Sequence, residues 1–326
     1  MQIVTQSTIS QTMKKLISLL FLSTLIFAVT LPVEAQTIPE ERLIWLTQKW
    51  EGERFEDGRP KVSDDVLERM KHVSIEEAWG IIRSFGYQNQ FTGGDWEILN
   101  PDEPVVGRAV TAQYMPSRPA LEETIIAKGV DDGRSGPMNT WPIDVLVDGD
   151  VYVADGYGKI KDGTLIGDRL GNTIYANSGN GVVFDGSSRD REGLSAIEGF
   201  NAFVREWDPS YLQQMMLMGL NTPIMVGETT VLPGDVVLAK PTGVIFIPAH
   251  LAEIVVDRSD VIRLTDIFAH QRVQDGTYTA GQMDTDWTES IQQDFFNWLE
   301  ENRPMLHEEY GIGESTINRI IETEEI

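Results

Sequence analysis

The hydrophobic pattern changes character several times along the chain. A continuous apolar run extends from Leu16 to Leu31. Residues 36–104 then show helical spacing, whereas residues 105–265 contain short β-branched runs that alternate with helical stretches. Residues 266–326 contain a predicted loop and then a stretch of helical spacing. Strands that alternate with helices are typical of layered α/β domains. The pattern therefore predicts an α/β core between a helical N-terminal segment and a C-terminal helical arm.

Capping residues locate the helices of the N-terminal segment. Glu41 to Trp50 has helical spacing, and Ser63 precedes a second helical stretch, Asp64 to Val73. Ser74 followed by Glu77 forms a capping box, in which each side chain bonds the backbone amide of the other residue. These signals predict three helices before the core begins.

The core and tail contain further predicted elements. The predicted strands are Val105–Tyr114, Asp144–Asp155, Ile174–Phe184, Pro223–Val226, Val236–Leu238 and Val244–Ile247. The predicted helices are Leu121–Lys128, Thr164–Tyr175, Ser210–Leu220 and Leu251–Val256. In the tail, a loop over Gln271–Asp286 precedes a helix over Thr288–Asn302.

The first apolar run has the form of a secretory signal. Lys14 and Lys15 precede it, and Val33 and Ala35 are the small residues that signal peptidase requires at the third and first positions before the cut. We expect cleavage after Ala35, which makes residues 1–35 a signal peptide and the mature protein periplasmic or secreted without a stable membrane span. A retained membrane anchor is the alternative, although the run is shorter than the roughly 20 residues that span a bilayer.

Charge and cysteine content exclude some functions. The chain has 26 Lys and Arg against 51 Asp and Glu, which gives a net charge of −25. Such a field repels phosphate backbones and anionic lipid headgroups, so we expect no nucleic-acid partner. The chain contains no cysteine, which removes disulfides, thiolate metal sites and cysteine nucleophiles together. Catalysis would depend on carboxylates, Arg, Lys, Ser, a few His, or a metal bound by oxygen.

Candidate chemistry gathers in the loops after two predicted strands. Gly167, Asp168, Arg169 and Leu170 follow the first of these strands. If a helix begins there, its free amides offer an anion site, because ligands of open α/β sheets collect beyond the carboxyl ends of strands. A plain helix start, with Gly167 as the boundary and Asp168 as the N-cap, explains the same residues.

Arg189 and Asp190 follow the next strand. An adjacent arginine and carboxylate at a strand end can hold a substrate carboxylate and a divalent cation, respectively. The alternative is an ordinary surface ion pair. The dipeptide by itself does not separate these interpretations.

Five sequence blocks, taken in order, resemble the RraA-like family, which includes the class II 4-hydroxy-4-methyl-2-oxoglutarate/4-carboxy-4-hydroxy-2-oxoadipate aldolases. In that family, as here with Gly167, a glycine precedes an Arg-Asp pair by about twenty residues. The supporting blocks are GRAVTAQY at 107–114, GDVYVADGYG at 149–158, GVVFDGSSRD at 181–190, LPGDVVLA at 232–239 and GVIFIP at 243–248. The family continues Arg-Asp-x-x-Glu/Asp, whereas here Glu192 comes one place early and Gly193 follows it.

The resemblance implies a role for each matching residue. Asp190 would hold Mg²⁺ or Mn²⁺, and Arg189 would contact a 2-oxo acid. The amides of Arg169 and Leu170, beside Gly167, would receive the substrate carboxylate. Asp168 would move a proton through water. Arg169 stands where the family is commonly apolar.

The resemblance also implies a fold and a function. We expect the layered β/β/α, swivelling-type fold of RraA-like proteins, with domains at 1–35 (signal), 36–104 (helical segment), 105–265 (core) and 266–326 (tail). The implied activity is a divalent-metal-dependent lyase that releases pyruvate from a 2-oxo acid, by retro-aldol cleavage or by decarboxylation. The alternative is a non-catalytic regulatory or binding protein. The implied assembly is a homotrimer or a dimer of trimers.

Overall fold

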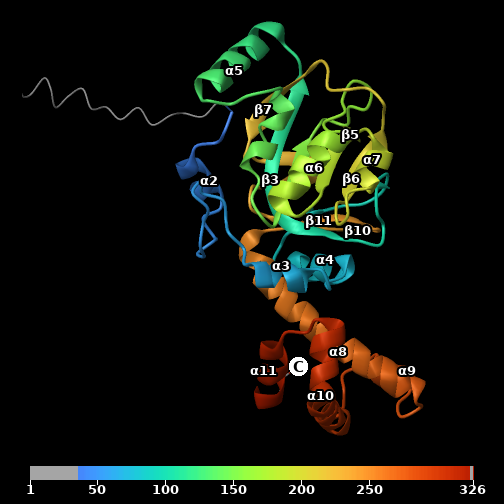
Figure 1. The fold of residues 1–326 in the computed structure, drawn as a ribbon. Coiled ribbons are helices and arrows are strands. Elements are labelled where there is room, and N and C mark those ends of the chain that lie inside the picture. Colours follow the sequence, from blue (N-terminus) through green and yellow to red (C-terminus); the bar gives the residue numbers. More distant parts are fainter. Residues whose placement is uncertain (1–35, 324–325) are drawn as a thin grey trace, which may run out of the picture.

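The computed structural model describes residues 36–323 and 326, and the predicted signal peptide lies outside these residues. The helices are α2 (Glu40–Leu46), α3 (Asp64–Met70), α4 (Ile75–Ser84), α5 (Pro119–Asp131), α6 (Asp168–Ser178), α7 (Arg191–Ser195), α8 (Ala252–Gln274), α9 (Ala280–Met283), α10 (Glu289–Tyr310) and α11 (Glu314–Thr323) (Figure 1). The strands are β1 (Phe91–Thr92), β2 (Glu97–Ile98), β3 (Val105–Pro116), β4 (Asp150–Asp155), β5 (Val182–Ser188), β6 (Ala202–Trp207), β7 (Met215–Leu220), β8 (Ile224–Val226), β9 (Thr229–Val231), β10 (Val236–Lys240) and β11 (Gly243–Ile247). Within the described residues, no helix combines the length and apolarity needed to cross a bilayer.

One large sheet organises the core. Its strand order is β1-β11-β10-β3-β4-β5-β6-β2, and β7 pairs with β3 beside this path. Strands β3, β4, β5 and β6 are mutually parallel, while β10, β11 and β7 run antiparallel to their neighbours. The carboxyl ends of β4, β5 and β6 therefore meet at one edge, where the predicted site residues begin.

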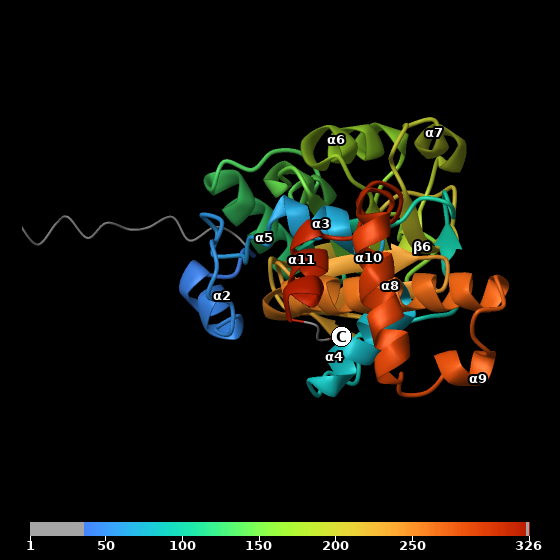
Figure 2. The ribbon, with the colours of Figure 1, turned by 90° about the horizontal axis from the view of Figure 1, so that it is seen from below.

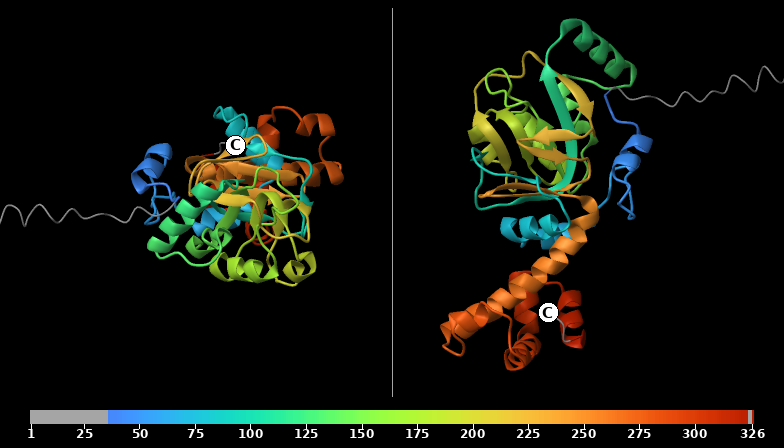
Figure 3. Two further views of the ribbon diagram at one scale, coloured as in Figure 1. Left: turned by 90° about the horizontal axis from the view of Figure 1, so that it is seen from above. Right: turned by 180° about the vertical axis from the view of Figure 1, so that it is seen from behind.

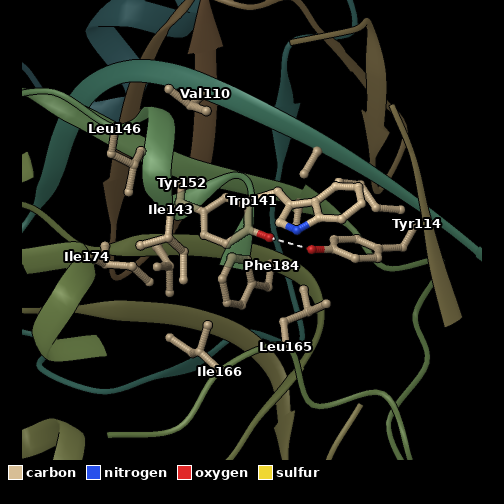
Figure 4. Close-up of a cluster of buried hydrophobic side chains, with 14 of the residues drawn as sticks. Val110, Tyr114, Trp141, Ile143, Leu146, Tyr152, Leu165, Ile166, Ile174 and Phe184 are labelled. Carbon is tan, nitrogen blue, oxygen red and sulfur yellow. Dashed lines mark hydrogen bonds between the residues drawn. The ribbon is translucent and has the colours of Figure 1, made fainter. Parts of the chain in front are cut away.

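Buried side chains divide the core into layers. One apolar cluster lies between the parallel strands and α6 and α7, and includes Tyr114 and Tyr152, whose hydroxyl groups are 2.8 Å apart (Figure 4). A second cluster lies inside the curved sheet, between the parallel strands and β8 to β11. A third joins the outer face of β10 and β11 to α3, α4 and α8. Along β10, Val236 and Val237 belong to opposite clusters, as the period-two geometry of a strand requires.

This layering confirms the predicted α/β fold, and the capping signals of the N-terminal segment are confirmed as well. The Ser63 side chain accepts a hydrogen bond from Val66 N, and Ser74 and Glu77 form the complete capping box. The segment is tied to the sheet by a buried ion pair, in which Arg59 Nη1 lies 3.1 Å from Asp150 Oδ1. The segment therefore packs as part of the core.

Helix α8 leads from the core into the helical C-terminal arm, and the views from below and from behind show α9 at its far end and α10 and α11 packed beside it (Figures 2 and 3). Leu264, Phe268 and aromatic residues of α10 form an apolar cluster of their own there. Asp260 of α8 is fully buried and accepts hydrogen bonds from Arg69 Nη2 at 2.6 Å and Gly313 N at 3.0 Å. The arm is thus fastened to α3 as well as to α8.

Some predicted elements were wrong. The stretch Ser210–Leu220, predicted as a helix, contains strand β7, whose backbone pairs with β3. The prediction failed because consecutive Met and Leu side chains of β7 are buried, so the stretch lacks the alternation that indicates a strand. The predicted strand Ile174–Phe184 merged the end of α6 with the start of β5. The predicted loop Gln271–Asp286 contains α9, and α10 continues eight residues beyond Asn302, to Tyr310. Strand β6 was missed.

Candidate functional site

The first turn of α6 begins at the glycine that the sequence singled out. Gly167 is the N-cap of α6, and Asp168 is the first helical residue, so a helix does begin here, but the alternative interpretation was wrong in making Asp168 its N-cap. The Asp168 carboxylate accepts a hydrogen bond from Arg169 N at 2.7 Å. Gly167 is buried, and because it has no side chain, the residues that follow β5 can lie directly against the start of this helix.

Arg189 and Asp190 follow β5 directly and lie beside that turn. Arg189 N donates to Ile166 O at 3.1 Å, so the residues before α6 run alongside the end of β5. A Cβ atom at Gly167 would collide with Asp190 Oδ2 and would lie 3.0 Å from Arg189 Nε. The structure therefore brings together Gly167, Arg189 and Asp190, which lie more than twenty residues apart in the sequence.

The backbone of Asp190 adopts an uncommon conformation. Its φ of 56° and ψ of 42° lie in the left-handed region, which Asp and Asn tolerate better than most residues. Strained backbone of this kind costs about 1–3 kcal/mol and persists where the surroundings impose it, often at functional sites. The Asp190 side chain is 46% exposed and the Arg189 side chain 39%, and Arg189 Nε lies 3.5 Å from Asp190 Oδ2. Both groups remain accessible to a ligand.

Two glycines, Gly171 and Gly193, bring α7 against α6, a packing role that the sequence analysis did not predict for either. A Cβ atom at Gly193 would lie 2.7 Å from Asp168 Cβ and 3.1 Å from Asp168 Oδ2. A Cβ atom at Gly171 would collide with the buried side chain of Leu194. The four-residue spacing of Gly167 and Gly171, one helical turn, was the available signal for this close packing. Gly193 occupies the position at which the family pattern has an acidic residue.

Two further acids of the strand ends face away from α6. Asp155 and Asp185 occupy opposite positions on β4 and β5, on the face that carries Val153 and Val183 of the inner cluster. Asp185 accepts hydrogen bonds from Arg205 Nε at 2.7 Å and Gly227 N at 3.0 Å. Burial raises the pKa of Asp155, and the nearby charge of Asp185 adds to this shift. These acids hold the β8–β9 hairpin and stay outside the candidate site.

The candidate site offers single oxygen ligands rather than a metal cage. Within residues 36–323 and 326, no group of three or more His, Cys, Asp or Glu side chains is arranged to hold a metal ion. A single carboxylate such as that of Asp190 suits Mg²⁺, because this ion commonly keeps several waters and binds through one or two carboxylates together with the substrate. The exposed carboxylate of Asp190 leaves room for such waters.

Comparison with known proteins adds to this geometry. The family model for RraA-like proteins, described as Aldolase/RraA, matches residues 60–246, which is more than half of the chain. The chain belongs to the RraA-like family. The RraA-like family includes metal-dependent aldolases and also non-catalytic inhibitors of ribonucleases.

Individual relatives of this RraA-like chain are distant. Protein DlpA of Legionella pneumophila is 28% identical over 168 residues, which cover 52% of this chain but only a quarter of that protein's length. An uncharacterised protein from Pseudomonas syringae has a TM-score of 0.57 at 23% identity, covering 71% of this chain and 97% of its own. RraAS2 of Streptomyces coelicolor, described as an unusual member of the RNase ES inhibitor RraA family, has a TM-score of 0.55 at 23% identity, covering 65% and 100%. These two structures confirm the RraA-like fold.

Proposed function

We propose that this chain is a divalent-metal-dependent carbon–carbon lyase that releases pyruvate from a 2-oxo acid. The observation that supports the proposal best is the contact of Gly167 with Arg189 and Asp190. It places a helix N-terminus, a guanidinium and an accessible carboxylate at one strand edge. These three groups are what a 2-oxo acid needs for binding and for stabilisation of an enolate.

The reaction itself defines the tasks of the residues. Cleavage of the C3–C4 bond of a 4-hydroxy-2-oxo acid leaves the electron pair on the pyruvate enolate and converts C4 into a carbonyl carbon. The 4-hydroxyl proton must therefore leave, and the enolate carbon must later gain a proton. Decarboxylation of an oxaloacetate-like acid reaches the same enolate by loss of carbon dioxide. Both reactions use one binding site for the pyruvate half.

The chain's own residues can divide these tasks. The amides of Arg169 and Leu170 in the first turn of α6 would bind the substrate carboxylate, because helix N-termini favour anions. At Arg169 the substrate would replace the Asp168 carboxylate, to which Arg169 N donates in the absence of ligand. Arg189 would donate to the keto oxygen, where negative charge develops. Asp168, exposed beside Gly193, would exchange the proton through a water molecule. Each role stays within the first turn of α6 or the end of β5.

Asp190 would hold the cation, Mg²⁺ or Mn²⁺. Such an ion supplies Lewis-acid stabilisation of the enolate charge when it is bound. Because Asp190 supplies one carboxylate, water and substrate would complete the coordination of the ion, which fits the accessible position of Asp190.

A coupled pyruvate-release assay tests this proposal. Purified protein is incubated with oxaloacetate and with 4-hydroxy-2-oxo diacids, with Mg²⁺, with Mn²⁺ and with EDTA. We expect pyruvate release well above that of the same substrate and metal without protein, and we expect EDTA to abolish this release and either metal to restore it. Release that is insensitive to EDTA, or absent from the whole panel with both metals, would remove the lyase assignment.

A non-catalytic binding role is the second candidate. One relative of the same fold, RraAS2, is described as a member of a ribonuclease-inhibitor family. The net charge of −25 would suit a basic protein partner. Pull-down with a basic partner that survives the Arg189→Ala and Asp190→Ala substitutions, from protein without turnover, would favour this candidate.

Export and assembly remain part of the proposal. Cleavage after Ala35 would place the protein in the periplasm or outside the cell, and N-terminal sequencing of the mature product tests it. The proposed assembly is a homotrimer or a dimer of trimers, which light scattering of the purified protein measures directly.

A further inference from the structure

Arginines are concentrated around the candidate site of this strongly acidic protein. Arg169 lies in the first turn of α6, Arg191 is the first residue of α7, and Arg189 comes two residues before α7. Arg189 is close to Asp190, but neither Arg169 nor Arg191 forms an ion pair with another residue in the described part of the chain. Among the described residues, two positive charges are thus left without an acidic partner at one edge of a chain of net charge −25.

Arg191 is held in a defined place rather than swinging freely in solvent. It is the first residue of α7, and the left-handed backbone of Asp190 sets the direction in which α7 starts. Its guanidinium lies over the indole ring of Trp207, 5.7 Å from the ring centre, which is within the range of a cation–π contact. Such a platform reduces the side-chain entropy that Arg191 would lose on binding an anion.

Trp207 is itself fixed by the sheet. It is the last residue of β6 and lies opposite Ser188, the residue before Arg189. Asp208 N donates to Ser188 O at 3.0 Å, so the pairing continues past the end of the strand. Trp207 Nε1 is buried and has no hydrogen-bond partner among the described residues. The ring is therefore held by packing against the apolar cluster next to α6.

Three segments therefore lie side by side along the rim. The segment before Gly167 neighbours the end of β5, which carries Arg189, and β5 in turn neighbours the end of β6, which carries Trp207 with Arg191 over it. Neighbouring strands lie about 4.8 Å apart, so the rim from the α6 terminus to Trp207 spans about 10 Å. A five- or six-carbon acid with one carboxylate at the start of α6 would extend along part of this distance, and the long side chain of Arg191 would cover the rest.

We propose that Arg191 is a specificity residue that binds the carboxylate at the far end of a 2-oxo diacid, the end remote from the 2-oxo group. The inference rests on the proposed function, which places the pyruvate half of the substrate at the first turn of α6 and Arg189. It assigns to this chain a preference for diacids over monoacids of equal length, set by one cation on an aromatic platform. The absence of an acidic side chain at Gly193 removes a group that would repel the same carboxylate.

Binding measurements test this inference without turnover. Calorimetry with Mg²⁺ compares 2-oxoglutarate with 2-oxopentanoate, which has the same chain length but no distal carboxylate. We expect wild-type protein to bind the diacid at least tenfold more tightly. Arg191→Met keeps an apolar stem over Trp207 and should lose this preference through weaker diacid binding, with monoacid affinity unchanged within about twofold. Arg191→Lys should recover part of it.

A matched control and a cleavage assay separate the possible failures. Arg319→Met removes one exposed positive charge from α11, in the distant arm, and should keep the full preference for the diacid. A preference retained in Arg191→Met, or lost equally in Arg319→Met, would overturn the assignment of Arg191. Pyruvate release from 4-hydroxy-2-oxoglutarate and 4-hydroxy-2-oxopentanoate is measured in parallel. Selective binding without release from either of these acids or from oxaloacetate would overturn the lyase proposal and leave the anion-binding role of Arg191 standing.

Discussion

The substitution Gly167→Ala examines the site at its narrowest point. The φ of −131° and ψ of −169° at Gly167 describe extended backbone that any residue adopts, so the backbone does not require glycine there. Space does, because the added methyl group would collide with Asp190 Oδ2. The Asp190 side chain is 46% exposed and can rotate away into solvent. We therefore expect a loss of less than about 1 kcal/mol in stability, below the 1–3 kcal/mol typical of overpacking a rigid core.

The effect of Gly167→Ala on turnover should be much larger than its effect on stability. Displacing a positioned catalytic group by about 1 Å can cost roughly a hundredfold in rate. We expect metal-dependent pyruvate release to fall by about that factor and the metal concentration for half-maximal activity to rise. The matched control is Gly80→Ala in α4, where an added methyl group meets open space and should raise stability by up to about 1 kcal/mol with unchanged turnover. Wild-type rate and metal dependence in Gly167→Ala would refute the reasoning.

Other predictions address the neighbouring charges and one buried acid. Asp190→Asn keeps a residue that tolerates the left-handed backbone, so we expect an unchanged melting temperature without metal and loss of metal-dependent turnover; near-normal activity at low metal would place the ion elsewhere. Arg189→Ala should lower kcat by roughly a hundredfold, with partial recovery in Arg189→Lys, and kinetics showing only a raised KM would limit Arg189 to ground-state binding. Burial raises the pKa of Asp235 to about 7, although its carboxylate accepts a hydrogen bond from Leu232 N. In the unfolded chain the pKa is about 3.9, so between these values only the native state holds the proton and stability should fall by roughly 4 kcal/mol as pH rises from about 4 to about 7. Asp235→Asn should flatten this dependence in denaturant titrations, and a slope equal to that of wild type would exclude Asp235 as its source.

The sequence predicted elements best where local signals were strong. The caps at Ser63 and Ser74 and the β-branched runs of β3, β10 and β11 were located closely. Strand β7 was mistaken for a helix because Met and Leu favour helices in isolation, and only pairing with β3 decides its conformation. Tertiary contacts of this kind produce no helical or strand periodicity of hydrophobic residues in the sequence.

The candidate site was predictable in its residue types but not in its detailed contacts. Spacing and family resemblance indicated Gly167, Arg189 and Asp190, and the structure brings them together. The approach of Gly193 to Asp168, and the position of Arg191 over Trp207, depend on how α7 starts. That start depends on a left-handed residue, which a single sequence does not reveal when the residue is Asp rather than Gly.

Helix α8 has a consequence for how the molecule comes apart. Val255 and Val256 at its beginning belong to the cluster with α3 and α4, while Leu264 and Phe268 further along belong to the cluster of the arm. A continuous helix of 23 residues therefore serves two apolar cores, and Asp260 lies buried between them. If α8 unfolds, the apolar side chains of both cores are exposed to water. Heating should therefore melt the sheet domain and the arm in a single cooperative transition rather than as separate units.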